Sequence, residues 1–231
     1  MNAMPETADG TTQLPMYLLT IRGTLAPATL EAARAVHNET AGAPANVAAA
    51  KALGDLSHMV YVPTAPESAG EFLILDVWNN MDGLGQFFAN PHVQEQAGQI
   101  FASRDPVVWA PAAGFVDYHL PAPYGKNDRV VVVVRGMVHS HAAAQRAHNA
   151  VVASLINATR QAGALSHEAY FRMAPPNTPE ALEFCAVDVW ADPAGLALYA
   201  KPEFGHAIGE MLAGPPSVST WTHPAGSWVE W

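Results

Sequence analysis

The amino-acid sequence carries one series of landmarks twice, in the same order. His37-Asn38 recurs 111 residues later as His148-Asn149, and Asp76-Val77-Trp78 recurs as Asp188-Val189-Trp190. The surrounding sequence has diverged, whereas these polar and aromatic residues have stayed. Packing alone does not favour those residue types, so the repeat predicts two copies of one unit, each with its own pocket. The other recurring landmarks are Arg22-Gly23 with Arg135-Gly136, Leu56-Ser57-His58 with Leu165-Ser166-His167, and Phe115–Tyr118 with Trp228–Trp231.

The length of 231 residues suits two domains of about 110 residues each, and each is large enough to bury its own core. We expect the first domain at residues 16–120 and the second at residues 129–231. Residues 121–128, between them, are rich in turn residues and predict a linker. Residues 1–15 are polar, lack the pattern of a signal peptide and predict a disordered tail.

Charge and composition argue against several classes of partner. The net charge is -10 with only 11 lysine and arginine residues, whereas nucleic acids and anionic membranes are bound by basic surfaces. No apolar run approaches the length of a membrane span. The single cysteine, Cys185, excludes a disulfide framework and a thiolate metal cluster. We therefore expect a cytoplasmic protein that binds neither nucleic acid nor membrane.

Each half is predicted to follow the order β-α-β-β-α-β, from its apolar β-branched runs and helical periodicities. That order is the ferredoxin-like split βαβ unit, whose single sheet leaves one face uncovered. Two units can cover these faces by packing them together. The sequence therefore predicts an α+β fold in which tandem ferredoxin-like repeats form an intramolecular dimeric α+β barrel. The elements expected in the first half are a strand at 16–22, helices at 27–40 and 46–53, strands from His58 and up to Trp78, a helical region at 82–102 and a closing strand. Those expected in the second half are a strand at 130–136, a helix at 141–159, strands from His167 and up to Trp190, a helical region at 193–212 and a closing strand.

The spacing of a histidine and an aspartate around a turn places them side by side. His58 and Asp76 are equally far from Glu67, which lies in the turn between the second and third strands. They are therefore expected to be near cross-strand neighbours. His167 and Asp188 flank the corresponding turn of the second half in the same way.

Two further side chains are expected on the same apolar face. Alternation along the third strand groups Asp76 with Trp78. His37 lies on an apolar stripe of the preceding helix, at helical spacing, so it is directed at the same sheet. The residues expected to converge in the second half are His148, His167, Asp188 and Trp190.

A histidine paired with a buried carboxylate has a fixed tautomer and raised basicity, as a general base requires. The alternative is that the pair only satisfies two buried polar groups, but its retention in both halves favours a chemical role. Arg22 and Arg135, at the ends of the first strands, either bind an anionic substrate group or pair with a carboxylate. The candidate catalytic residues are His37, His58, Asp76, His148, His167 and Asp188, and the candidate substrate contacts are Trp78, Trp190, Asn38, Asn149, Arg22 and Arg135.

The stretch from Phe72 through Trp78 and Asp82 to Pro91-His92 resembles the antibiotic biosynthesis monooxygenase-like domains of the dimeric α/β-barrel superfamily. Those domains typically show a strand ending in tryptophan, an acidic helix start, and a proline-containing turn before a further helical segment. Residues 187–202 repeat the pattern. The resemblance implies the barrel fold. It also implies one of several activities, since the superfamily includes cofactor-free oxygenases, haem enzymes, isomerases and proteins without known chemistry.

Departures from the family pattern narrow these activities. Haem-degrading relatives are expected to carry a histidine about ten residues beyond the tryptophan, where this chain has Phe88 and Ala200. That difference argues against haem. Relatives often have a histidine in the helix before the proline turn as well, and both halves lack it. A catalytic base is therefore expected on the side of His58 and Asp76.

The leading hypothesis is a cofactor-independent oxygenase that acts on a small aromatic or polyketide-like phenolic substrate. His58, held by Asp76, would deprotonate the substrate, Trp78 would stack on its ring, and the anion would react with dioxygen. His37 and Asn38 would hold the substrate or a peroxide by hydrogen bonds. We expect a pseudo-dimeric monomer or a homodimer.

Three alternatives remain open from the sequence. His37, His58 and Asp76 supply the two histidines and one carboxylate of a non-haem Fe(II) oxygenase. The same residues also suit a non-oxidative isomerase or lyase. A fused barrel with two apolar pockets also suits a non-catalytic small-ligand-binding or accessory protein, although such a carrier needs few buried ionisable groups.

Overall fold

The computed structural model describes residues 16–119, 129–175 and 177–231, so the predicted tail at 1–15 and linker at 121–128 lie outside the described residues. The elements of the first half, residues 16–119, are β1 (Tyr17–Leu25), α1 (Leu30–Glu39), α2 (Pro44–Ala52), β2 (Asp55–Pro63), the 3₁₀ turn η1 (Pro66–Ser68), β3 (Glu71–Trp78), α3 (Met81–Ala89), α4 (Pro91–Ile100), β4 (Phe101–Pro111) and β5 (Tyr118–His119). Those of the second half, residues 129–231, are β6 (Val130–Met137), α5 (His141–Gln161), β7 (Ala164–Arg172), β8 (Glu183–Trp190), the 3₁₀ segment η2 (Pro193–Ala200), α6 (Pro202–Met211) and β9 (Ser217–Thr222).

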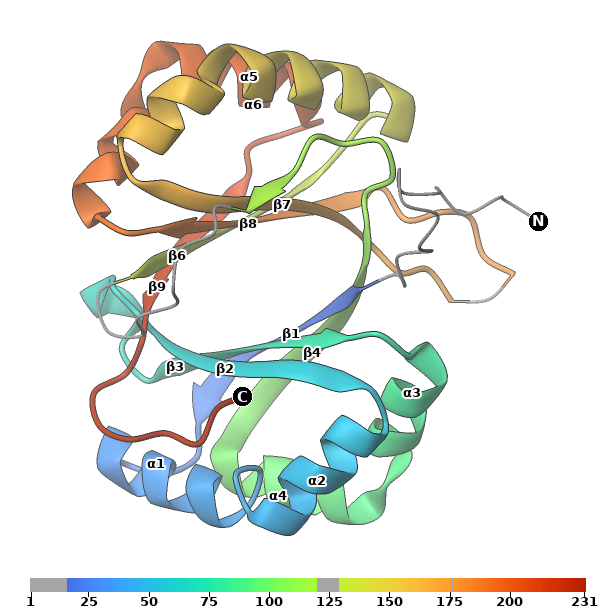
Figure 1. Ribbon diagram of the computed structural model, residues 1–231, viewed down its shortest axis with the longest axis vertical. Coiled ribbons are helices and arrows are strands. Elements are labelled where there is room, and N and C mark those ends of the chain that lie inside the picture. Colours follow the sequence, from blue (N-terminus) through green and yellow to red (C-terminus); the bar gives the residue numbers. More distant parts are fainter. Residues whose placement is uncertain (1–15, 120–128, 176) are drawn as a thin grey trace.

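The strands of the described part close into an antiparallel barrel. Their order is β4-β1-β3-β2-β9-β6-β8-β7, and pairing of β4 with β7 closes the ring. The two-residue strand β5 also pairs with β7, beyond the end of β4. Helices α1 to α4 cover the outside of the barrel on one side and α5 and α6 cover it on the other (Figure 1). This arrangement confirms the predicted α+β barrel.

Alternation along the strands separates three cores. In β3, Phe72, Ile74 and Trp78 pack toward the helices of the first half, whereas Leu73 and Leu75 point into the barrel. The barrel interior is filled from both halves, and the helices of the second half cover a core of their own. The predicted face of β3 is therefore confirmed, and it is the helix-covered face that carries the candidate site.

The helical region predicted at 82–102 consists of two helices, α3 and α4, which are separated at Asn90. Asn90 has an extended backbone, its side chain caps α4, and Pro91 begins that helix. A proline disfavours the helical conformation in the residue before it, so α3 ends there. The same break occurs before Pro202, where a 3₁₀ segment gives way to α6. In both halves the second helical region is therefore two short pieces.

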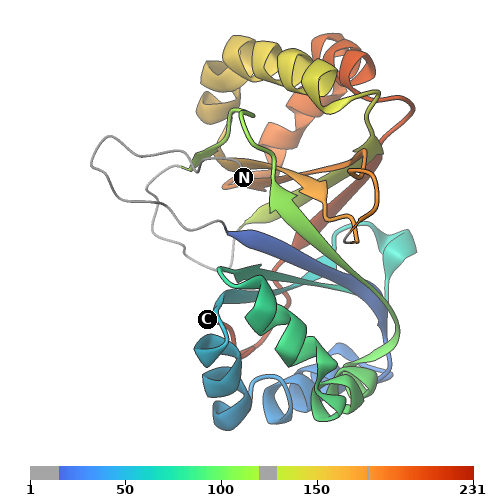
Figure 2. The same ribbon diagram turned by 90° about the vertical axis from the view of Figure 1, so that its right-hand side faces the viewer.

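Each half sends its last segment across to the other half. The end of β4, Trp109–Pro111, pairs with β7, and residues 112–119, the first arm, continue over the second half. The end of β9 pairs with β2, and residues 223–231, the second arm, continue over the first half. Figure 1 shows the red second arm passing beyond β2 toward the helices of the first half, and Figure 2 shows β4 crossing between the halves. The sequence predicts a closing strand in each half but not this exchange.

Candidate active site

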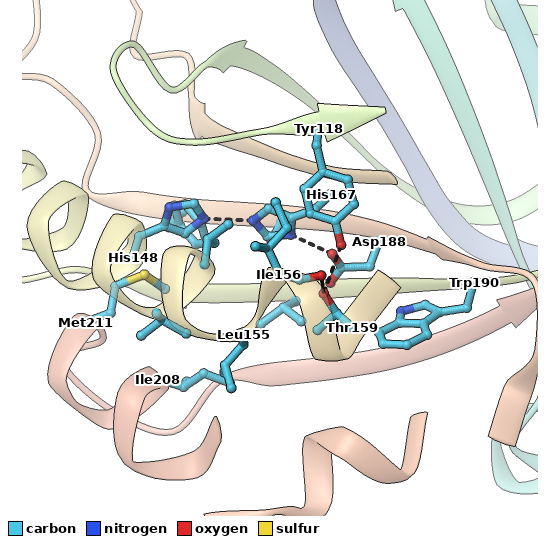
Figure 3. Close-up of a pocket in the computed structure, with 15 residues that line it drawn as sticks. Tyr118, His148, Leu155, Ile156, Thr159, His167, Asp188, Trp190, Ile208 and Met211 are labelled. Atoms are coloured by element: carbon cyan, nitrogen blue, oxygen red, sulfur yellow. Dashed lines mark hydrogen bonds and ion pairs between the residues drawn. The ribbon is translucent and has the colours of Figure 1, made fainter. Parts of the chain in front are cut away.

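Four polar side chains form a row in the second half, and Figure 3 shows three of them, His148, His167 and Asp188. Asn149 Oδ1 lies 3.1 Å from His148 Nδ1. His148 Nε2 lies 2.8 Å from His167 Nε2, and His167 Nδ1 lies 2.5 Å from Asp188 Oδ1. Helix α5 supplies the first two residues, and the paired strands β7 and β8 supply the others, because His167 and Asp188 are direct cross-strand partners.

The first half repeats the row. Asn38 Oδ1 lies 3.1 Å from His37 Nδ1, and the two Nε2 atoms of His37 and His58 lie 2.9 Å apart. His58 Nδ1 lies 2.7 Å from Asp76 Oδ1. The predicted cross-strand pairing of His58 with Asp76 is therefore confirmed. The convergence of His37 with this pair is confirmed as well.

Each row ends against the arm of the other half. Asn149 Oδ1 accepts the N–H of Val116 at 2.8 Å, and its Nδ2 donates to the Gly114 carbonyl at 2.8 Å. Asn38 Oδ1 accepts the N–H of Val229 at 2.9 Å, and its Nδ2 donates to the Ser227 carbonyl at 2.9 Å. The asparagines thus tie each site to the backbone of an arm.

The two histidines of a row have opposite pKa shifts. Burial and the neighbouring His167 lower the pKa of His148 to about 4, against the effect of Asn149. Burial alone would lower the pKa of His167, but the charge and hydrogen bond of Asp188 outweigh it, so that pKa is raised. In the first half, burial and the neighbouring His58 lower the pKa of His37 to about 4. The charge and hydrogen bond of Asp76 outweigh burial at His58, so the pKa of His58 is raised. A proton on each pair therefore resides on the histidine beside the aspartate.

The row of the second half borders a cavity of about 100 Å³. Its walls are mainly apolar, and the polar groups that reach it are the two histidines, the carboxylate, Thr159 and Tyr118. The Tyr118 side chain comes from the first arm, and its Oη lies 3.4 Å from Thr159 Oγ1. The cavity is lined by Tyr118, Val134, His148, Val151, Val152, Leu155, Ile156, Thr159, His167, Phe184, Ala186, Asp188, Trp190, Ile208 and Met211.

The cavity of the first half is smaller and differently lined. Its volume is about 70 Å³, and it contains Asp55 and Trp231 beside the histidine and aspartate of the row. The Trp231 ring stacks on His58, with centroids 4.5 Å apart and planes at 18°. The Tyr118 ring is more distant from His167, at 6.0 Å and 34°. The indole of Trp231 therefore covers the imidazole that a substrate ring would need to reach.

Asp55 adds a buried carboxyl to the first cavity. Burial and the nearby Asp76 raise its pKa to about 8. The residue at the same place in the second half is Ala164, since Asp55 pairs with Trp78 and Ala164 pairs with Trp190. The two cavities thus differ in charge as well as in size.

Several sequence-predicted contacts lie away from the cavities. Asn38 and Asn149 face the arms, and Trp78 is buried in the first core, whereas Trp190 lines the second cavity. Arg22 is paired with Glu71 at 2.6 Å, and Arg135 is paired with Glu183 at 2.6 Å. Each guanidinium also lies over a tryptophan ring, Trp221 for Arg22 and Trp109 for Arg135. Both arginines therefore line a separate pocket on the barrel-interior side of the sheet. They do not line the two cavities under the helices.

The residues proposed for Fe(II) do not surround a common point. Such a site needs ligand atoms from two histidines and a carboxylate that converge on one metal ion. His58 contacts His37 through Nε2 and Asp76 through Nδ1, on the other side of its ring. Within residues 16–119, 129–175 and 177–231, no group of three or more His, Cys, Asp or Glu side chains has a metal-binding arrangement. The row does not fit the Fe(II) triad.

Sequence reasoning missed four residues that line the cavities, namely Tyr118, Trp231, Thr159 and Asp55. The first two belong to the recurring landmarks Phe115–Tyr118 and Trp228–Trp231. Their recurrence was a signal of importance, but no local pattern shows that each lies over the opposite half. Asp55 and Thr159 do not recur in the other half, so the repeat does not single them out.

Sequence comparison does not place the chain, because no protein-family model and no curated protein matches it. Within its described part, no helix is both long and apolar enough to cross a membrane.

Solved structures share the fold along nearly the whole chain. A "putative monooxygenase" from Lactobacillus acidophilus NCFM is 13% identical, with a TM-score of 0.58 over 91% of this chain and 94% of its own. A protein of the same description from Fusobacterium nucleatum is 12% identical, with a TM-score of 0.60 over 90% and 92%. An anthrone oxidase-like protein is 14% identical, with a TM-score of 0.60 over 92% of both chains. The chain therefore has the dimeric α+β barrel fold of these proteins, as its resemblance to antibiotic biosynthesis monooxygenase-like domains predicts.

Proposed function

We propose that the protein is a cofactor-independent oxygenase of small phenols, with its chemistry in the cavity of the second half. The observation that carries this proposal is the row of Asn149, His148, His167 and Asp188 beside an apolar cavity. A histidine whose pKa is raised by a neighbouring carboxylate, at the edge of such a cavity, is a candidate for proton transfer. The fold shared with monooxygenase-like and anthrone oxidase-like proteins is consistent with it.

The cavity suits one aromatic ring with a hydroxyl group. Apolar cavities of about 150 Å³ bind benzene, so a volume of about 100 Å³ limits the closed site to a small ring. Leu155, Ile156 and Ile208 supply apolar walls (Figure 3). Tyr118 Oη and Thr159 Oγ1 supply hydrogen bonds for a second oxygen on the ligand. A small phenol satisfies both the shape and the polar groups.

The pair of His167 and Asp188 takes the phenol proton. A phenol such as a tyrosine side chain has a pKa near 10, so a base with a raised pKa is better matched to it than an ordinary histidine. In the form of the protein in which His167 Nε2 carries no hydrogen, this atom accepts the proton when the phenol replaces His148 as its partner, and that form gains population as the pH rises. His148, with a pKa of about 4, stays neutral and does not compete for it. The proton is thereby held beside the phenolate.

The phenolate then gives electrons to dioxygen. Since the proposal includes no external reductant, the substrate must supply all four electrons. A phenol with hydrogen at the para position meets this requirement, because phenol plus dioxygen gives p-quinone plus water with all atoms balanced. One oxygen atom becomes the new carbonyl and the other leaves as water. The protein supplies the base, the apolar walls and the orientation.

The second half is favoured because Trp231 occupies the corresponding place in the first half. Its ring is stacked on His58, and the remaining cavity is smaller and carries Asp55. An aromatic substrate would have to displace this indole. We therefore assign the first cavity no substrate.

The test is oxygen uptake by chelator-treated protein with a panel of small phenols, coupled to detection of the quinone. We expect uptake of one dioxygen per quinone formed. Asp188→Asn, which keeps the side-chain shape but removes the charge that supports His167, should lower kcat/KM by about 10²- to 10⁴-fold. His206→Ala, at an exposed histidine on α6, should leave the rate unchanged.

Two results would contradict the proposal. One is the absence of uptake with every para-unsubstituted phenol in the panel. The other is uptake that disappears on chelation and returns with Fe(II), which would support the metal-dependent alternative despite the geometry of the row. Turnover of phenols without oxygen consumption would instead favour an isomerase or lyase.

A further inference from the structure

We infer that Asn149 and Asn38 are positioning residues that fix the tautomers of the buried histidine pairs, and that the arms of the opposite halves hold them in place. The inference deepens the proposed function, since it concerns the same site, but it rests on hydrogen-bond geometry alone. Neither asparagine is among the residues that line the two site cavities. Their role is therefore on the histidines and not on a ligand.

The orientation of the Asn149 amide is set by the backbone of the first arm. Its Oδ1 accepts the N–H of Val116 and its Nδ2 donates to the carbonyl of Gly114, both at 2.8 Å. A flipped amide would set donor against donor and acceptor against acceptor at these two distances. The flip would lose both hydrogen bonds, each worth about 0.5–1.5 kcal/mol. The amide thus has one orientation.

A fixed amide dictates where the hydrogens of the row lie. Asn149 Oδ1 only accepts, so His148 Nδ1, at 3.1 Å, must carry a hydrogen. A neutral imidazole has one hydrogen, which leaves a lone pair on His148 Nε2. His167 Nε2, at 2.8 Å, must then be the donor of that contact. The amide therefore determines the state of a ring two contacts away.

The consequence is that the His167–Asp188 unit carries an extra proton at rest. His167 donates from Nε2 to His148, and a second hydrogen lies between His167 Nδ1 and Asp188 Oδ1. Removing the Nε2 hydrogen would leave two lone pairs facing each other across 2.8 Å. The negative groups that face this histidine act in the same direction, namely Asp188 on β8, Glu168 on β7 and Asp117 in the first arm. A substrate that replaces His148 removes the opposing lone pair.

The first half shows the same geometry in its own row. Asn38 is held by Val229 and Ser227 of the second arm and contacts His37, which contacts His58. The two halves have diverged elsewhere in sequence, yet both keep this arrangement. Each arm thereby sets the protonation of a site in the other half.

The test is ¹⁵N NMR of the full chain labelled in its histidines, with no substrate present. We expect His148 to be neutral with its hydrogen on Nδ1, and His167 to have both ring nitrogens protonated at neutral pH. In Asn149→Ala, His148 should lose its single tautomer, and the titration midpoint of His167 should fall by at least one pH unit, a tenfold weaker hold on its proton. Asn38→Ala is the matched control, because it should alter only His37 and His58.

A conservative variant separates this role from a merely structural one. In Asn149→Asp, a carboxylate oxygen still accepts from His148 Nδ1 and from Val116, so the Nδ1-protonated tautomer should be kept. A wild-type His148 with its hydrogen on Nε2, or an unchanged midpoint of His167 in a folded Asn149→Ala, would overturn the inference. Since no oxygen or phenol is used, failure of the oxygenase proposal would leave this result standing.

Discussion

Asp55 and Ala164 occupy the same place in the two halves, opposite Trp78 and Trp190. Asp55 is buried, and its pKa of about 8 lies far above the ordinary value of 3.8. The folded state therefore binds a proton that the unfolded chain releases between these two pH values. Stability is lost as the pH rises through this window.

Asp55→Asn is expected to stabilise the protein at pH 8 by about 2–4 kcal/mol, because the amide stays neutral and can still accept the Ser57 N–H. The gain should vanish near pH 3, where the wild-type carboxyl is protonated in both states. Urea unfolding at the two pH values measures the difference. A variant that is less stable at both would show that Asp55 is a favourable ionised group.

The raised pKa of His167 predicts the pH dependence of activity. The base form exists only above that pKa, so kcat/KM for a phenol should rise with pH above 6.5 and then level off. Asp188→Asn removes the carboxylate that raises the pKa and should move this rise to lower pH. Rates measured across the pH range with both proteins check this. A wild-type profile that falls with rising pH would mean that the pair acts as an acid.

Some of these residues could be placed from the sequence and others could not. His58 and Asp76 were predictable because a hairpin's turn sets its register, so equal spacing from the turn places two side chains opposite each other. Tyr118 and Trp231 were not, because their partners lie more than a domain away along the chain. No local pattern encodes a contact of that kind.

Among the strands, the close approach of β1 to β4 depends on the absence of a side chain at Gly23. A methyl group on it would lie 2.0 Å from the Ser103 carbonyl oxygen of β4. The three atoms nearest to a methyl group on its counterpart, Gly136, all belong to the side chain of Leu212, the first at 2.8 Å. A side chain at Gly23 would therefore collide with backbone, which cannot easily shift, whereas one at Gly136 would collide with a side chain that can rotate away.

Gly23→Ala should cost more than about 2 kcal/mol, since the backbone of two paired strands must separate, whereas Gly136→Ala should cost clearly less. Chemical denaturation of both variants gives the comparison. Equal losses would contradict the pairing of β1 with β4 at this register.

The helices show the limits of periodicity at this scale. The apolar stripe of His37 predicted the buried face of α1, and His148 predicted that of α5. Helical periodicity does not show the break before Pro91, which follows from the backbone preference of a residue before proline and which the proline-containing turn of the resembled domains indicates. Such a break changes where each helix begins and ends, but both helices still cover the same face of the sheet.

For the molecule as a whole, the exchanged arms are expected to make the two halves unfold as one cooperative unit. Phe115 of the first arm packs on His148 and Phe184 of the second half. Trp228 of the second arm packs on His37 and Phe72 of the first half. Loss of contacts from the first arm therefore lowers the stability of the second half, and loss of contacts from the second arm lowers that of the first half.

Phe115→Ala should destabilise the protein by about 3 kcal/mol, and Trp228→Ala by a similar amount. In wild type and variants, far-UV and near-UV circular dichroism should follow one common unfolding transition. Two separate transitions, with only one shifted by each variant, would show that the halves unfold independently and that the arms do not couple them.

The proposed function requires that a phenol in the second cavity is held as its anion beside a protonated His167. The most direct measurement is the absorption spectrum of 4-nitrophenol bound to the protein one pH unit below the solution pKa of the ligand. We predict one bound ligand per chain in its ionised form, and loss of that ionisation in Asp188→Asn. Binding in the neutral form to the wild type, or equal ionisation by both proteins, would contradict the account.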